Sequence, residues 1–266
     1  MAKKRTKKSS SVWKKFLFIT VVILGALGAF SGWQFHEVVY KANVGFSEDD
    51  KYFYIPTGSN FIQVSNALVE ENIIRNQGTF DWVAEQKKYR LNIKPGRYLL
   101  SPEMSNNDLV NLLRSGEQEP VKITFNNVRF KEELVEKIAP FIEADSTELI
   151  NLLNDEEFVG KYGFTASTFL TLFLPNTYEF WWNTSAEQFV TRMAEEYKKY
   201  WTSNRKQMAT DLGLSQSEVS ILASIVQKET NKNDEKPTVA GVYLNRLKKG
   251  MLLQACLLYT SPSPRD

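Results

Sequence analysis

Two residue types on which much enzyme chemistry depends are almost missing from this sequence. Its 266 residues include one cysteine, Cys256, and one histidine, His36. A single cysteine permits no disulfide framework and no cysteine-based metal site. His36 lies next to the first apolar run, so the rest of the chain has no histidine for a Ser-His-Asp triad, a Cys-His pair or a zinc site. Any enzymatic activity must therefore use carboxylates, amides, hydroxyls, lysine or arginine, and we expect no metal.

Acidic side chains are absent from the first fifteen residues. These residues carry seven positive charges, although the net charge of the whole chain is only +2. Such an arm binds nucleic acid or a membrane surface. The next residues favour the membrane, because residues 16–33 hold no charge and as a helix would span roughly 27 Å, close to the hydrocarbon thickness. Trp13 and Trp33 flank this run as interfacial aromatic residues do. We predict a basic arm over residues 1–15, a transmembrane helix over residues 16–33, and no binding of nucleic acid.

The sequence has no second long apolar run, which predicts a single-pass protein. The excess of lysine and arginine before the run places the N-terminus in the cytoplasm and the rest of the chain outside it. The alternative is a cleaved signal peptide, for which Ala29-Phe30-Ser31 would be a poor cleavage site. The length of the run favours an uncleaved anchor, followed by a connector over residues 34–50.

Beyond the connector, short strand and helix patterns predict an α+β fold with two parts. Residues 51–118 form a small module in which residues 51–56 and 97–100 indicate strands. The spacing of apolar residues predicts one helix that starts at Phe61, a second over residues 79–88, and a third that begins at Ser105 and ends at Gly116. Residues 119–255 open with a strand at 121–125 and are otherwise mostly helical, with a long amphipathic helix over 185–201 whose inward residues are listed here: Phe189, Met193, Tyr197 and Tyr200. Trp181 and Trp182 either stack on sugar rings or pack a core.

One carboxylate, Glu229, lies on the apolar face of a short helix. Residues 215–218 (Ser-Gln-Ser-Glu) resemble a capping box that opens this helix. Leu222, Val226 (or Ile225) and Glu229 then recur at helical spacing, so they share one face. Burial against apolar neighbours keeps a carboxyl group partly protonated, as a general acid for glycosidic bond cleavage must be. The alternative is that the apolar stripe ends before Glu229, which would then be exposed at the end of the helix.

Four segments carry a resemblance to a known family. They are residues 221–230 (ILASIVQKET), residues 239–254 (VAGVYLNRLKKGMLLQ), residues 173–180 (FLPNTYEF) and residues 54–59 (YIPTGS). Together they resemble the YceG-like (MltG) family of endolytic murein transglycosylases, over roughly residues 52–255 and in the family's order. Gln227 stands where the family most often has glutamate. We assign the acid to Glu229, because Glu229-Thr230 resembles the Glu-Ser pair of other lytic transglycosylases.

The resemblance implies a fold, a reaction and a location. It implies a LysM-like α+β module over residues 51–118 and a mostly helical catalytic domain of the lytic transglycosylase type over 119–255. Glu229 would protonate the bond between N-acetylmuramic acid and N-acetylglucosamine and then accept the proton of the muramic 6-hydroxyl, leaving a 1,6-anhydro end. This lyase reaction uses no water, metal or cofactor. The implied location is the bacterial inner membrane, and the implied partners are peptidoglycan strands and peptidoglycan synthases. The module either contacts glycan or serves only as a packing module.

Several further residues are candidates for the site. Candidates for binding substrate are Thr177, Tyr178, Glu179, Asn245, Arg246 and Gln254. Glu235 is a candidate for a carboxylate that positions the site residues without touching the substrate. Each has a structural alternative. The segment 177–179 could form a turn after Pro175, Arg246 could be half of an ion pair, and Glu235 could be a charge favouring a helix N-terminus near Pro237. On that last helix we expect four residues to pack inward: Val239, Val242, Tyr243 and Leu247.

Two rival functions stay open, and the end of the chain departs from the family. A non-enzymatic wall-binding scaffold would tolerate loss of Glu229, and a glycan hydrolase would leave reducing ends and usually needs two carboxylates. After Ala255 the sequence no longer follows the pattern of the family. Residues 256–266 look like the in-frame translation of a transposase adapter used in sequencing libraries rather than a natural Pro/Ser-rich tail, so we expect the catalytic domain to be incomplete.

Overall fold

A computed structural model describes residues 10–47, 49–126 and 128–253. The chain forms a mixed α+β structure and divides into two compact units. The first unit comprises residues 1–120 together with Trp181–Asn183, and the second comprises Val121–Phe180 and the chain from Thr184 onward. Gln254 and the tail 256–266 lie outside the described residues.

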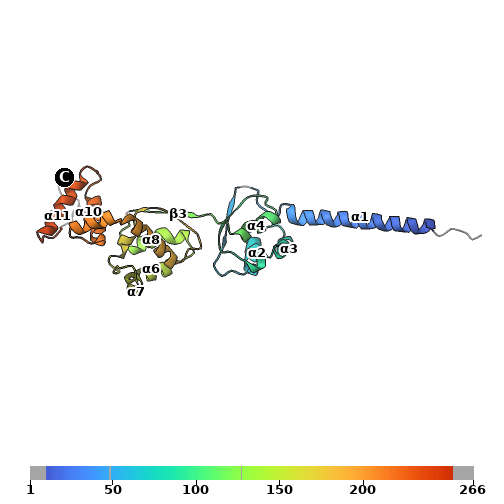
Figure 1. Ribbon diagram of the computed structural model, residues 1–266, viewed down its shortest axis with the longest axis horizontal. Coiled ribbons are helices and arrows are strands. Elements are labelled where there is room, and N and C mark those ends of the chain that lie inside the picture. Colours follow the sequence, from blue (N-terminus) through green and yellow to red (C-terminus); the bar gives the residue numbers. More distant parts are fainter. Residues whose placement is uncertain (1–9, 48, 127, 254–266) are drawn as a thin grey trace, which may run out of the picture. The chain divides into compact units, whose positions relative to one another are not determined.

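Helix α1 (Ser10–Tyr40) enters the first unit as one continuous ribbon (Figure 1). Its segment Lys15–Tyr40 is long and apolar enough to cross a membrane, which is consistent with a single-pass membrane anchor. The first part of the connector expected over residues 34–50 is helical, because α1 continues to Tyr40. Residues 34–40 contain neither glycine nor proline, so nothing ends the helix where the apolar run ends.

The end of α1 is built into the core of the first unit. Val39 and Val44 are buried there. The Asn106 amide donates to the carbonyl oxygen of Val38 at 2.9 Å, and the Asn43 amide donates to Asn106 Oδ1 at 2.7 Å. The Asn106 amide thus satisfies a carbonyl group in the last turn of α1, which would otherwise lose its hydrogen bond to water on burial, and Asn43 holds the Asn106 side chain in place.

The rest of the first unit follows the predicted order of elements. Strand β1 (Lys51–Ile55) pairs antiparallel with β2 (Gly96–Leu100), with Lys51 opposite Leu100 and Ile55 opposite Gly96. Helices α2 (Phe61–Glu70), α3 (Gln77–Gln86) and α4 (Asn106–Ser115) and the 3-10 turn η1 (Tyr89–Leu91) complete it. Helix α4 begins at the predicted cap Ser105 and ends at Gly116, whose φ of 76° is the left-handed conformation that glycine adopts most easily.

The second unit opens with a two-stranded antiparallel sheet whose strands lie far apart in the sequence. Strand β3 (Val121–Phe125) pairs antiparallel with β4 (Asn176–Phe180), with Val121 opposite Phe180. The alternative of a turn over 177–179 was therefore wrong, because these residues are held extended by pairing with a strand more than 50 positions away. The sequence of each strand alone does not reveal such a pairing.

Helices make up the rest of the second unit. They are α5 (Lys131–Ile138), α6 (Ser146–Asn154), α7 (Glu156–Gly160), α8 (Ala186–Tyr200), α9 (Ser203–Asp211), α10 (Gln216–Glu229) and α11 (Lys236–Lys248), with 3-10 turns η2 (Ala139–Phe141) and η3 (Phe169–Leu172). In α8, Phe189, Met193 and Tyr197 are buried as predicted, but Tyr200 is exposed. Tyr200 lies in the last turn of α8, where its ring packs beside that of Trp201 and under the Arg205 guanidinium.

An aromatic cluster joins β4 to α8 and η3. The Phe180 ring lies 5.1 Å from Phe189, and Phe173 stacks on Phe189 at 5.8 Å. Phe169 meets Phe173 edge-on at 5.6 Å. Trp181 and Trp182 do not join this cluster. They belong to the first unit, where Trp182 packs edge-on against Tyr54 at 5.0 Å and Trp181 is half exposed.

Candidate active site

Helix α10 begins at the predicted capping box. The Glu218 amide donates to Ser215 Oγ at 3.2 Å, and the Ser215 amide donates to a Glu218 carboxylate oxygen at 2.7 Å. The two side chains thereby satisfy two of the four amides that a helix start leaves without an intrahelical partner. The helix runs from this cap to Glu229, which is its last residue.

Helices α10 and α11 pack against each other through a small apolar core. Leu222, Val226 and Tyr243 are buried in it, with Val239 and Leu244 packed around them. The expectation that Val242 and Leu247 pack inward was wrong, because their side chains are 51% and 41% exposed. The face of α11 that meets α10 passes through residues 239, 240, 243 and 244, and Val242 and Leu247 lie at its margins.

Glu229 continues the buried stripe of α10 and contacts α11. Its side chain is half-buried, one turn beyond Val226 on the same face. The Tyr243 hydroxyl of α11 faces the Glu229 carboxylate closely enough for the two groups to interact. Burial raises the pKa of Tyr243, and its interaction with the negative charge of Glu229 raises it further, so the phenol keeps its proton. The carboxylate of one helix and the phenol of the other thus lie next to each other where the two helices meet.

The loop after Glu229 is held by a second carboxylate. Thr230 Oγ1 donates to Glu235 Oε2 at 2.7 Å, the Lys232 amide donates to Thr230 Oγ1 at 3.1 Å, and Lys232 Nζ lies 3.0 Å from Glu235 Oε1. The Thr230 hydroxyl first, and then the Lys232 ammonium, hold the pKa of Glu235 below its usual range. Glu235 therefore fixes the turn that follows Glu229, through the residue adjacent to it.

Arg246 lies on α11 one turn beyond Tyr243. Its Nη1 donates to the Leu253 carbonyl oxygen at 2.7 Å, and its own carbonyl oxygen accepts from the Met251 amide at 2.9 Å. Its positive charge acts on Tyr243 and opposes the rise in that residue's pKa. Within the described residues Arg246 forms no ion pair with a carboxylate, so the alternative of a structural ion pair is not what the structure shows. Asn245 is exposed beside it.

Residues 177–179 make their interactions within the two-stranded sheet of β3 and β4 and the turn before it. Thr177 Oγ1 lies 2.7 Å from Thr124 Oγ1, the Tyr178 hydroxyl donates to the Leu174 carbonyl oxygen at 2.7 Å, and the Glu179 carboxylate lies 3.7 Å from Lys122. The structure thus gathers Glu229, Glu235 and Arg246 on the α10–α11 pair. Thr177, Tyr178 and Glu179 instead stabilise the β3–β4 sheet.

Sequence reasoning missed the role of Tyr243, which it placed only in the apolar core. A signal was present, because a buried tyrosine hydroxyl needs a hydrogen-bond partner. The apolar faces of the two helices offer it one acid, Glu229. Among residues 10–253, apart from 48 and 127, no group of three or more His, Cys, Asp or Glu side chains could hold a metal ion.

The sequence profile of the YceG-like family matches residues 53–260. The chain belongs to the YceG-like family. The matched residues include β1 from Phe53 onward, the paired strands β3 and β4, and helices α10 and α11, and hence Glu229, Tyr243 and Arg246.

Relatives of this YceG-like chain carry a functional name. A protein of Streptococcus pneumoniae serotype 2 named endolytic murein transglycosylase is 25% identical over 275 residues, which cover 91% of this chain and 49% of the relative. A Bacillus subtilis strain 168 protein of the same name is 24% identical and covers 80% of this chain and 63% of its own length. The chain therefore spans about half to two thirds of the length of these relatives. A crystal structure of the yceG-like protein lmo1499 from Listeria monocytogenes is 25% identical, covers 79% of this chain and 74% of that chain, and has a TM-score of 0.46.

Proposed function

We propose that this YceG-like protein is a membrane-anchored lytic transglycosylase that cleaves peptidoglycan glycan strands. The observation that carries the proposal is the half-buried carboxylate of Glu229, which lies beside the Tyr243 hydroxyl where α10 meets α11. Its relatives' name, endolytic murein transglycosylase, supports the same reaction. The rival reading, a non-enzymatic scaffold, gives no reason for a carboxylate and a tyrosine hydroxyl to lie together at the edge of a small core.

The reaction needs one carboxyl group that works twice. Protonated Glu229 gives its proton to the glycosidic oxygen as the bond from C1 of N-acetylmuramic acid to that oxygen breaks. The resulting carboxylate takes the proton of the 6-hydroxyl of the same sugar, whose oxygen bonds to C1 and closes a 1,6-anhydro ring. Glu229 ends protonated, as it began, and no water is consumed. A single positioned group that donates and then accepts a proton is general acid–base catalysis.

The neighbouring residues position Glu229 in this scheme. Tyr243 is proposed to donate a hydrogen bond to one carboxylate oxygen and to leave the other for the substrate. Thr230 and Glu235 hold the loop directly after it, and Arg246 fixes the segment 251–253 beside α11. Asn245 is exposed next to Arg246 and is proposed to contact glycan, together with Gln254. Thr177 and Glu179 are proposed to contact glycan from the exposed face of β4, whereas the buried Tyr178 ring packs under the β3–β4 sheet.

The remaining parts of the proposal concern the anchor and the first unit. The basic residues before α1 place its N-terminus in the cytoplasm, so both units would lie outside the inner membrane. The first unit is proposed to be a LysM-like module that presents the second unit to nascent strands made by peptidoglycan synthases. Its order of strand, helices, strand and helix supports this assignment.

Mass spectrometry of cleavage products tests the function. The full chain in detergent micelles is incubated with uncrosslinked glycan strands, beside Glu229→Gln and the matched control Gln227→Glu, which changes an exposed residue of the same helix turn. We expect anhydro-ended fragments from the parent and the control. Glu229→Gln should lower the rate about a thousandfold, within the range for removal of a general acid. Reducing ends instead of anhydro ends would indicate a hydrolase, and intact strands with retained binding by all three proteins would indicate the scaffold.

A further inference from the structure

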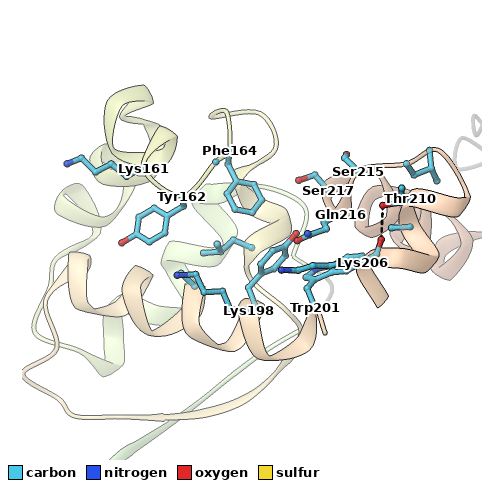
Figure 2. Close-up of a pocket in the computed structure, with 16 residues that line it drawn as sticks. Lys161, Tyr162, Phe164, Lys198, Trp201, Lys206, Thr210, Ser215, Gln216 and Ser217 are labelled. Carbon is cyan, nitrogen blue, oxygen red and sulfur yellow. Dashed lines mark hydrogen bonds between the residues drawn. The ribbon is translucent and has the colours of Figure 1, made fainter. Parts of the chain in front are cut away.

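The second unit contains a hollow at the opposite end of α10 from Glu229. Its volume is about 540 Å³, within the range of small-ligand sites. The loop after α7, helices α8 and α9 and the first turn of α10 line it (Figure 2). Glu229 is the last residue of a helix that begins at Gln216, so the two places are roughly 20 Å apart along the helix. The hollow is therefore separate from the candidate active site.

Aromatic rings form much of the lining. Tyr162 and Phe164 are half-buried, and the Phe164 ring meets Tyr197 edge-on at 5.4 Å. Trp201 lies 6.1 Å from Tyr197 and continues the row. In Figure 2, Phe164 lies above the hollow, and Lys198, Lys206 and Trp201 lie along its lower side. Tyr162 and Phe164 are the partly accessible rings, and they offer apolar faces on which the C–H faces of a sugar ring pack.

The charge around the hollow is positive. Lys161, Lys198 and Lys206 line it, and the lining includes no acidic residue. Within the described residues none of these three lysines forms an ion pair, whereas Lys199, the next residue of α8, lies 2.9 Å from Glu196. Lys161 points away from the hollow in Figure 2 and lies over the Phe158 ring. Lys198 and Lys206 are thus the two cations available to an anionic group in the hollow.

One buried donor in the lining lacks an acceptor. Trp201 is 5% exposed, and its Nε1 has no hydrogen-bond partner in the described structure. The indole is near the Tyr197 hydroxyl and lowers that residue's pKa, although burial raises it overall. The contact with Tyr197 does not reach hydrogen-bond geometry, so Nε1 bears the cost of an unsatisfied buried donor. Nε1 itself has almost no exposed surface, so the indole forms part of the wall of the hollow and does not offer this donor to a ligand.

We propose that the hollow is a binding site for a saccharide that carries a carboxylate. The Tyr162 and Phe164 rings pack against the sugar, and Lys198 and Lys206 bind the carboxylate. A neutral sugar would leave the two ammonium groups without a partner, and a small inorganic anion would leave the rings uncovered. The site does not require that Glu229 cleave glycan, so it goes beyond the proposed reaction.

Calorimetric titration of the full chain in detergent micelles tests the site. The probe is the disaccharide of N-acetylglucosamine and N-acetylmuramic acid, which carries a lactyl carboxylate. The comparison is chitobiose, which has the same ring size and no carboxylate. We expect the acidic disaccharide to bind about tenfold more tightly, the effect of one charge-assisted hydrogen bond, and to lose affinity as salt rises from about 0.05 M to about 0.5 M. Equal binding of chitobiose would overturn the proposal.

Two variants and a matched control assign the binding to this hollow. Lys198→Gln combined with Lys206→Gln should weaken binding of the acidic disaccharide about tenfold or more, because both side chains are exposed and their loss leaves the core unchanged. Lys199→Gln removes the same charge from the same helix outside the hollow and should have no effect. Phe164→Ala should weaken binding severalfold while a melting curve shows a folded protein. Identical affinities of the double variant and the control would overturn the site, even if Phe164→Ala fails to fold.

Two further probes separate the sources and the competing class. A disaccharide containing glucuronate tests whether any acidic sugar suffices; tighter binding of it than of the muramic disaccharide would still support a carboxylated saccharide but would assign it to another wall polymer. A mononucleotide also combines rings and negative charge. If it bound more tightly than both saccharides, the proposal would be wrong. None of these titrations measures cleavage, so their outcome is independent of the test on Glu229.

Discussion

The first unit and the α10–α11 pair differ in how much apolar surface each buries. The first unit encloses many fully buried side chains, among them Phe53, Leu68, Phe80, Tyr98 and Leu109. The core of the α10–α11 pair contains three buried residues, Leu222, Val226 and Tyr243, and each retains 6–9% exposure. The part of the molecule that carries the proposed chemistry is therefore the part with the weaker core, as expected where function draws on regions of low local stability.

The same substitution in the two cores measures this difference directly. Leu109→Ala in α4 removes a fully buried side chain and should cost about 3–4 kcal/mol, because the transfer and cavity terms add. Leu222→Ala in α10, where 9% of the residue is exposed, should cost about 2 kcal/mol. Hydrogen exchange resolved by peptide measures the two regions separately. Equal losses of protection would show that the α10–α11 core is as tight as that of the first unit.

Tyr243→Phe separates packing from positioning within the weaker core. The substitution keeps the ring that packs against Leu222 and Val226 and removes the hydroxyl that faces Glu229. We expect the rate of strand cleavage to fall about tenfold, as for loss of one hydrogen bond of about 1–1.5 kcal/mol. Protection from hydrogen exchange in α10 should change little. Tyr98→Phe in the first unit, whose hydroxyl binds the Lys94 carbonyl oxygen at 2.9 Å, is the control and should leave the rate unchanged.

Helix caps provide a smaller and matched comparison. Ser105 and Ser215 each accept from the amide three residues later at 3.2 Å. Ser105 is 5% exposed and Ser215 is exposed. Replacing either by alanine should cost about 1 kcal/mol, with the larger loss at Ser105, where the freed amide is shielded from water. Denaturant unfolding followed by hydrogen exchange gives both values, and a larger loss at Ser215 would contradict the comparison.

The smallest expected effect concerns acid pH. Glu235 has a lowered pKa in the folded protein, so its hydrogen bonds to Thr230 and Lys232 contribute stability above the unfolded value of about 4.3. That contribution is lost as the pH falls through the folded pKa. Carboxyl NMR titration should give a midpoint for Glu235 below that of exposed Asp/Glu controls. Thr230→Val should raise this midpoint; an unchanged midpoint would show that Thr230 does not hold the carboxylate.

Local sequence signals predicted the elements of the first unit and the start of helix α10. The cap at Ser105, the stop at Gly116 and the box at Ser215 depend on residues within a few positions of each other, which is why sequence shows them. The pairing of β3 with β4 and the interaction of Tyr243 with Glu229 depend on distant segments. Helical spacing gave the period of α11 but not which side faces α10, and so Val242 and Leu247 were misplaced.

The buried amides of Asn43 and Asn106 at the end of α1 have a mechanical consequence. They join the last turn of the helix to the first unit without an intervening flexible joint. In a bilayer, a helix adjusts to hydrocarbon thickness by tilting. A helix fused in this way would pass each change of tilt to the first unit as a rigid rotation. The thickness of the surrounding lipid would thus set the angle at which the first unit meets the wall.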